Sequence, residues 1–148
     1  MASPNSTSIR FPALSFNEGW LGTVDSMDRV SRSSRSGFKR GLHRSLVLVD
    51  SAGNQFQVVG AEKVRTLVDG LGSLLGLLTG NPSLQVELIF APAGSISLDD
   101  LKKLITEAFE KHEDYWEEMS GFEQFRDRVG GATSLQQVFA AFKEFHLL

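Results

Sequence analysis

The stretch LVLVDSAGNQFQVV, residues 46–59, decides the fold, because two apolar runs flank a short polar link. Leu46 to Val49 and Gln55 to Val59 are rich in β-branched and apolar residues, the composition of strands with one buried face. The link begins with Asp50, which can bond its own backbone, and contains Gly53, which accepts a positive φ angle without a steric clash. The stretch therefore predicts an antiparallel hairpin with a bulged turn.

The sequence around this hairpin, which we place at about 43–60, predicts a further strand and a helical C-terminal third. Apolar and polar residues alternate over 84–90, which predicts a strand in the same sheet. Residues 98–145 show helical spacing, with capping residues at the helix starts. Early strands and late helices joined by short links predict an α+β fold. We expect a mainly antiparallel sheet of three to five strands, built on the central hairpin, with helices packed on one face.

Residues 61–78 show a second helical pattern. Apolar side chains recur there at three- and four-residue steps: Val64, Leu67, Val68, Leu71, Leu74, Leu75 and Leu78. This spacing predicts a helix lying on the core, although glycines that each cost roughly 1 kcal/mol leave its continuity open. The same region is a poor membrane span, because four glycines and Pro82 interrupt the uncharged stretch between Asp69 and Glu87. No membrane partner is therefore expected.

Length and composition indicate one soluble domain. The 148 residues suffice for a single domain, which we place at 9–148, after a loose tail at 1–8 that is rich in Ser, Asn and Pro. The chain has no cysteine, which excludes disulfides, thiolate metal ligands and a cysteine nucleophile, and which fits a reducing compartment. The first residues lack the apolar run of a signal peptide, so we expect a cytoplasmic protein.

No motif for catalysis or cofactor binding is present. Gly70 to Gly76 reads G-x-G-x-x-x-G, one residue longer than the dinucleotide fingerprint, and it follows a helical pattern instead of a strand. The sequence contains neither a phosphate loop nor a G-x-S-x-G nucleophile elbow. His43, His112 and His146 are too far apart in sequence for a zinc motif. We therefore expect no catalytic residues, no metal and no cofactor, in a protein that is not an enzyme.

Charge is distributed unevenly along the chain. Residues 1–50 carry seven Lys or Arg against four Asp or Glu, whereas residues 51–148 carry eight against fourteen. The acids concentrate between Glu107 and Glu123, where Lys111 is the only Lys or Arg. Aromatic residues lie inside this cluster, and aromatic anchors rimmed by charge concentrate binding energy in protein interfaces. We therefore predict a surface that binds a basic protein, formed by Glu110, Glu113, Asp114, Tyr115, Trp116, Glu117 and Glu118.

Other interpretations of the same residues remain open. The acids can form an ordinary solvated helix face, and Trp116 can pack in the core with Phe109 and Phe122. The basic segment 29–44 can contact nucleic-acid phosphates, but only Phe38 interrupts its cations, so the interleaved aromatics of a single-strand reader are missing. A chaperone for secreted effectors shares the small size and acidic pI, and it would need a dimer with an exposed apolar groove.

Two stretches together suggest a relationship. In GFKRGLHRSLVLVDSAGNQFQV (37–58) a Lys and a Gly enter a strand that ends Asp-Ser-x-Gly, and SISLDDLKKLITEAFEKHEDYWEEMSGF (95–122) is a capped helix ending in a Trp and acids. This combination, about a third of the chain, resembles small bacterial α+β proteins of the type found beside toxins as immunity proteins. The resemblance implies a non-catalytic binder that works by surface complementarity, and it transfers no functional residues.

Overall fold

The hairpin lies at the centre of a sheet of six antiparallel strands in the order β2-β1-β4-β5-β6-β3. The computed structural model describes residues 9–27, 31–68 and 70–147, so the tail predicted at 1–8 lies outside it. The strands are β1 (Ala13–Asn17), β2 (Trp20–Val24), β3 (Arg32–Ser34), β4 (Val47–Asp50), β5 (Asn54–Thr66) and β6 (Ser83–Ser95). The helices are α3 (Arg35–Arg40), the 3-10 helix η1 (Leu42–Ser45), α4 (Gly70–Leu78), α5 (Leu98–Lys111), α6 (Glu113–Glu117), α7 (Phe122–Gly130) and α8 (Leu135–Glu144).

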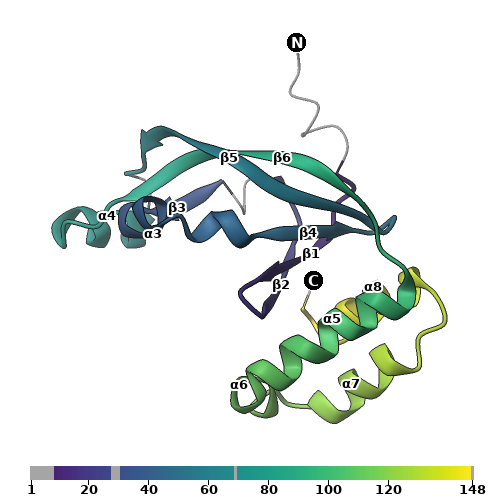
Figure 1. The fold of residues 1–148 in the computed structure, drawn as a ribbon. Coiled ribbons are helices and arrows are strands. Elements are labelled where there is room, and N and C mark those ends of the chain that lie inside the picture. Colours follow the sequence, from purple (N-terminus) through teal and green to yellow (C-terminus); the bar gives the residue numbers. More distant parts are fainter. Residues whose placement is uncertain (1–8, 28–30, 69, 148) are drawn as a thin grey trace.

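The predicted fold class is confirmed. The hairpin β4–β5 is central, β6 contains the strand predicted at 84–90, and α5 to α8 form the predicted helical C-terminal third. Figure 1 shows these helices in a layer under one face of the sheet. The sheet contains one strand more than the predicted three to five, because the three-residue β3 of the basic segment pairs with β6.

The turn of the hairpin has the predicted geometry. The Gly53 N–H donates to the carbonyl oxygen of Asp50 at 3.0 Å, and Gly53 has a φ of 83°. The side chain of Asp50 is fully buried. Its carboxylate accepts the backbone N–H groups of Arg10 at 3.1 Å, Ala52 at 3.0 Å and Asn54 at 2.9 Å. Asp50 therefore fixes the turn and also ties the segment that precedes β1 to the hairpin.

Substitution of Gly53 tests this geometry. A Cβ atom at Gly53 would lie 2.7 Å from Cδ1 of Leu135, in a backbone conformation that side chains with a Cβ rarely adopt. We expect Gly53→Val to lower the free energy of unfolding by about 1–3 kcal/mol. Gly94 is the matched control, because it has a φ of 95° and nothing within 4 Å of a Cβ. Chemical denaturation should show the larger loss for Gly53→Val; equal losses would contradict the contact with Leu135.

Neighbouring residues on β1 and β4 belong to two separate apolar cores, one on each face of the sheet. Leu14 of β1 and Val49 of β4 pack against the helical layer, in a cluster with Leu101, Phe125 and Phe142. The residue before each of these two strand positions points to the opposite face, as the pleat requires. On that opposite face, Ala13 and Leu48 belong to a second buried cluster. It also contains these side chains of β5 and β6: Phe56, Leu84, Val86, Leu88 and Phe90.

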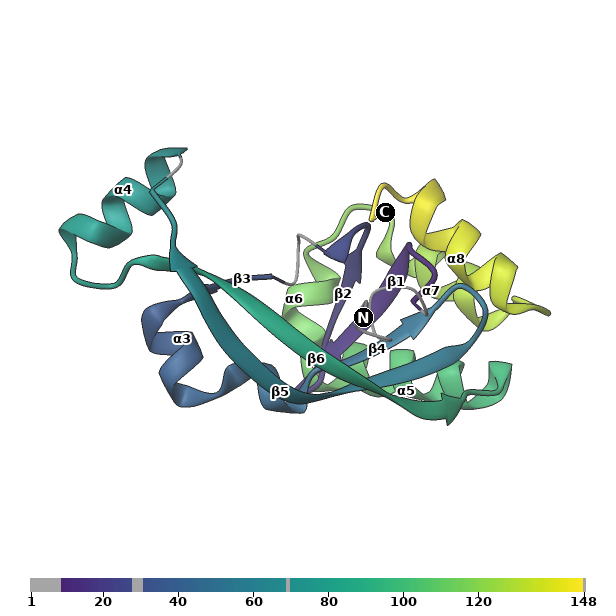
Figure 2. The same ribbon diagram turned by 90° about the horizontal axis from the view of Figure 1, so that it is seen from above.

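The strands β5 and β6 form a long ribbon, and this ribbon corrects one prediction. The helix predicted at 61–78 is wrong for 61–66, because β5 continues to Thr66 and pairs with β6, with Lys63 opposite Val86 and Thr66 opposite Leu84. Cross-strand pairing outweighs the helical spacing of these residues. The remaining helix, α4, does not lie on the core. Figures 1 and 2 show α4 at the tip of the ribbon, away from the helical layer.

Three irregularities in the β5–β6 pairing shape this ribbon. They fall between Asn54 and Phe56, between Val58 and Gly60, and between Lys63 and Arg65. Bulges increase the local twist and bend a strand. They allow β5 and β6, of thirteen residues each, to curve along their length within the sheet. Within the part of the chain that the structure describes, no helix is long and apolar enough to cross a bilayer.

Candidate functional site

The predicted acidic surface forms where α5 ends and α6 begins. Ser97 caps the start of α5 by accepting the backbone N–H of Asp100 at 3.1 Å. His112 then ends the helix with φ −124° and ψ 46°, while its N–H still donates to the Ala108 carbonyl. The chain changes direction at this residue and re-enters a helix. All five carboxylates of the predicted surface are exposed: Glu110, Glu113, Asp114, Glu117 and Glu118.

The two aromatic residues of the predicted surface have different environments. Trp116 is only 4% exposed, and its ring lies 5.0 Å from that of Phe109 and 6.2 Å from that of Phe122. It therefore packs in the core, which is the alternative that the sequence left open. Tyr115 is 57% exposed and remains available for a contact. The surface thus has one of its two predicted aromatic anchors, with Trp116 as the support behind it.

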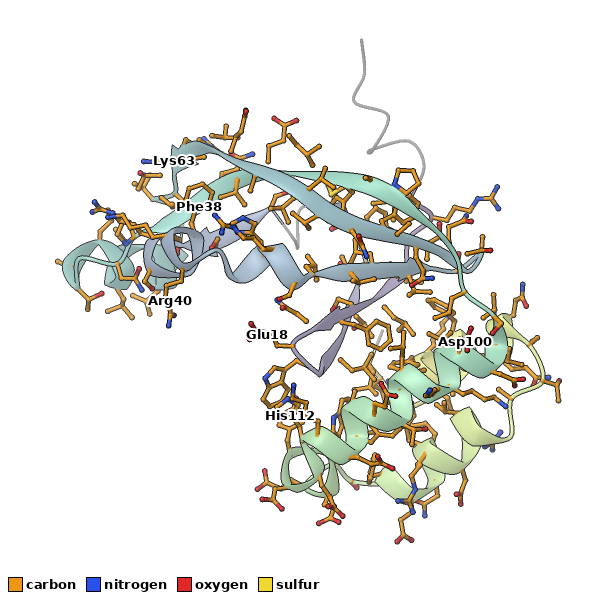
Figure 3. All side chains as sticks on the ribbon, in the orientation of Figure 1. Glu18, Phe38, Arg40, Lys63, Asp100 and His112 are labelled. Carbon is orange, nitrogen blue, oxygen red and sulfur yellow. The ribbon has the colours of Figure 1, made fainter. Side chains whose placement is uncertain are left out.

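The β1–β2 hairpin adds residues that the sequence analysis missed. Trp20 stacks on His112 with ring centroids 3.5 Å apart, and it meets Tyr115 edge to face at 5.2 Å. Gly19, with a φ of 82°, lets the hairpin tip approach α5 so closely that a Cβ there would overlap the Lys111 side chain. Figure 3 shows His112 below the hairpin tip that carries Glu18. Sequence spacing gave no signal for this contact, because about 90 residues separate the two segments.

A pocket of about 420 Å³ lies beside this aromatic group. Leu21, Met119 and Phe142 give it an apolar lining, and Tyr115 and Glu118 also line it. The indole Nε1 of Trp116, which also lines the pocket, is buried and has no hydrogen-bond acceptor within the described ranges. The pocket therefore offers apolar contact beside a carboxylate within one small volume.

Carboxylates crowd together on the other side of α6. Glu110, Glu113 and Glu117 line a groove of about 180 Å³ together with Arg126. The pKa of Glu117 is raised, first by the charge of Glu113 and then by desolvation, a hydrogen bond with Glu113 and the charge of Asp114, while Arg126 opposes the change. Arg126 also lies over the ring of Phe122 at 5.5 Å. One guanidinium does not balance this group, so the groove keeps a negative potential that attracts cations.

The basic segment 29–44, the alternative site, folds into β3, α3 and η1. Its residues 29 and 30 lie outside the described part of the chain. Arg35, Lys39, Arg40 and Arg44 are exposed. Phe38 is half-buried and stacks on His43 at 5.7 Å, so it offers no open ring for a nucleobase. The pKa of His43 is lowered, first by burial and then by the charge of Arg44, so His43 adds no positive charge at neutral pH.

Over the described ranges, no three side chains of the His, Cys, Asp or Glu type come together as a group that could hold a metal ion. The arrangement at α6 suits non-covalent contact, because its carboxylates are exposed and a pocket with an apolar lining lies next to them. Comparison of the chain with models of known protein families, with curated proteins and with solved structures finds no match.

Proposed function

We propose that this protein is a non-catalytic binding module that recognises a basic protein through the acidic surface at α6, in the manner of an immunity-type inhibitor. The observation that carries this proposal is the group of five exposed carboxylates beside an apolar pocket and an exposed tyrosine. The basic partner is recognised by its charge at long range and by one or more inserted side chains at contact.

The electrostatic part of the proposal rests on the crowding of Glu113 and Glu117. The raised pKa of Glu117 means that the folded chain brings two negative charges together at a cost. A cationic side chain placed beside both carboxylates removes this repulsion. Binding therefore regains the electrostatic free energy that folding costs at this pair.

The pocket provides the short-range contacts with the partner in this proposal. An arginine or lysine side chain can lay its apolar stem along Leu21, Met119 and Phe142 while its charged head meets Glu118. Tyr115 and Trp20 border this contact and provide ring surface at low conformational cost.

Replacing the crowded glutamates tests the proposal. We expect E113Q/E117Q to weaken binding of the purified partner, captured first from the native host, by roughly tenfold or more at low salt. Isothermal titration calorimetry at several salt concentrations should also show a smaller salt dependence for this variant. The same variant should unfold at no lower a temperature than the wild type. Above the raised pKa of Glu117 its ionised form opposes folding, and glutamine removes that repulsion.

The matched control is E62Q/E87Q. Glu62 and Glu87 are exposed and face each other across β5 and β6, so this variant has the same change in charge on a different surface. If both double variants weaken binding equally, α6 is not the binding surface. If the wild type instead retains nucleic acid at low salt and K39E/R40E releases it, segment 29–44 is the functional surface.

A further inference from the structure

The helix α4 presents an apolar surface that no other part of the described chain covers. Leu71 is 74% exposed and Leu78 is 83% exposed, and the leucines between them are at least 42% exposed. Leu71, Leu74, Leu75 and Leu78 are spaced three and four residues apart and share one face of the helix. The glycine side of α4 packs against the following loop, because a Cβ at Gly76 would lie 2.5 Å from the Asn81 carbonyl oxygen.

The backbone at the end of α4 satisfies its own hydrogen bonds. The Asn81 N–H donates to the Gly76 carbonyl at 2.8 Å, and the Thr79 N–H donates to the Leu75 carbonyl at 3.0 Å. The Thr79 hydroxyl donates to the same Leu75 carbonyl, also at 3.0 Å. Because these two carbonyls are bonded within the chain, they do not add to the cost of placing the end of the helix in an apolar environment.

Exposed cations lie at the same end of the molecule as this leucine surface. The loop that follows α4 is fixed to α3, where the Arg35 N–H donates to the Pro82 carbonyl at 2.9 Å. Figures 1 and 2 show α3 and α4 at this end in both views. The exposed cations here are Arg35, Lys39 and Arg40 of α3 and Lys63 and Arg65 of β5. The exposed acids of the same region, within the described ranges, are Glu62 and Glu87, so positive charge predominates.

Two other occupants fit these observations less well. Two helices of nine residues are each about 14 Å long and bury less area than a stable dimer needs, about 1,200 Å². A symmetric pairing would also bring the α3 cations of both copies together. A hydrophobic groove on another protein can accept leucines at this spacing, but it makes no use of the cations at the same end of the molecule. The helix α4 itself carries no charged residue, so an anionic bilayer would take the leucines at the headgroup boundary while the cations of α3 and β5 meet the headgroups.

We propose that α4 docks this protein onto a bilayer surface that carries anionic phospholipid. The leucines enter the boundary between headgroups and acyl chains, and the cations of α3 and β5 contact the headgroups. The sequence expectation of no membrane partner considered a spanning segment, and a surface contact needs no span. The proposal is independent of the function proposed for α6, because it uses neither its carboxylates nor its pocket.

Co-sedimentation with vesicles tests the proposal. We expect the wild-type chain to sediment with vesicles of phosphatidylcholine and phosphatidylserine, several-fold more than with phosphatidylcholine alone, and to be released at high salt. L74N/L78N should reduce the bound fraction roughly tenfold without lowering the unfolding temperature, since both leucines are exposed. K39E/R40E should reduce it several-fold, while K103E/K143E, which alters exposed cations of α5 and α8, should leave it unchanged.

Three results would overturn the proposal. The first is a wild-type chain that stays in the supernatant with the anionic vesicles. The second is equal sedimentation of L74N/L78N and the wild type, which would mean that charge alone binds the vesicles. The third is a wild-type dimer in analytical ultracentrifugation that L74N/L78N converts to a monomer, which would make a second copy of the chain the occupant of this surface.

Discussion

Asp50→Ala should lower the free energy of unfolding by about 3–5 kcal/mol, because it removes the acceptor of three backbone N–H groups at a buried position. These bonds come from Arg10, Ala52 and Asn54, so both the hairpin turn and the attachment of the segment before β1 depend on one carboxylate. Urea denaturation of the wild type and the variant measures the loss.

Two further variants locate the origin of this effect. Asp50→Asn keeps one acceptor oxygen for the turn but presents an amide N–H₂ where the second oxygen accepts the Arg10 N–H. Its loss should therefore be smaller than that of the alanine variant. Ser51→Ala, one residue later in the same turn, should change stability by less than about 0.5 kcal/mol. A loss for Asp50→Ala no larger than that for Ser51→Ala would contradict the role of the carboxylate.

Trp116→Ala should lower the free energy of unfolding by about 3–5 kcal/mol, whereas Tyr115→Ala should lower it by less than about 1 kcal/mol. The neighbouring residues differ because one ring is buried among Phe109, Phe122 and Phe125 and the other is exposed. Thermal and chemical denaturation give the two values. If the proposed surface binds a partner, Tyr115→Ala should weaken that binding, since Tyr115 is the exposed ring of the pair.

Trp116→Phe separates the two properties of the indole. Phenylalanine keeps an aromatic ring in the core and removes an N–H that has no acceptor within the described ranges. We expect a loss below about 1.5 kcal/mol, since the smaller ring leaves some space while the unpaired donor disappears. A loss as large as that of Trp116→Ala would show that the N–H has a partner that stabilises the fold.

Local signals were sufficient to predict the hairpin and the helical third. Asp50 and Gly53 specify a turn by short-range backbone chemistry, and Ser97 and Ser134 mark helix starts in the same way. The end of β5 could not be predicted like this, because Lys63 and Thr66 are strand residues only while β6 pairs with them. The exposure of α4 also escaped prediction, since periodicity identifies an apolar face without showing what covers it.

The exposure of the acidic residues was also predictable from local sequence, but their aromatic surroundings were not. A cluster of acids between Glu107 and Glu123 is a local property of the sequence, and all five carboxylates of the predicted set are exposed. Trp20 was not predictable, because only the folded sheet brings the β1–β2 hairpin beside α6. The burial of Trp116 depends likewise on α7, whose Phe122 and Phe125 complete its surroundings.

The separation of the acidic α6 from the basic α3 gives the molecule a permanent dipole moment that its net charge of −3 does not describe. Near a charged body, such a molecule experiences a torque as well as a force, so it rotates toward a preferred orientation during diffusion, before any contact forms. A cationic protein turns the α6 end toward itself and an anionic surface turns the α3 end toward itself. Because the two ends are separate, contact at one end leaves the other facing the solvent.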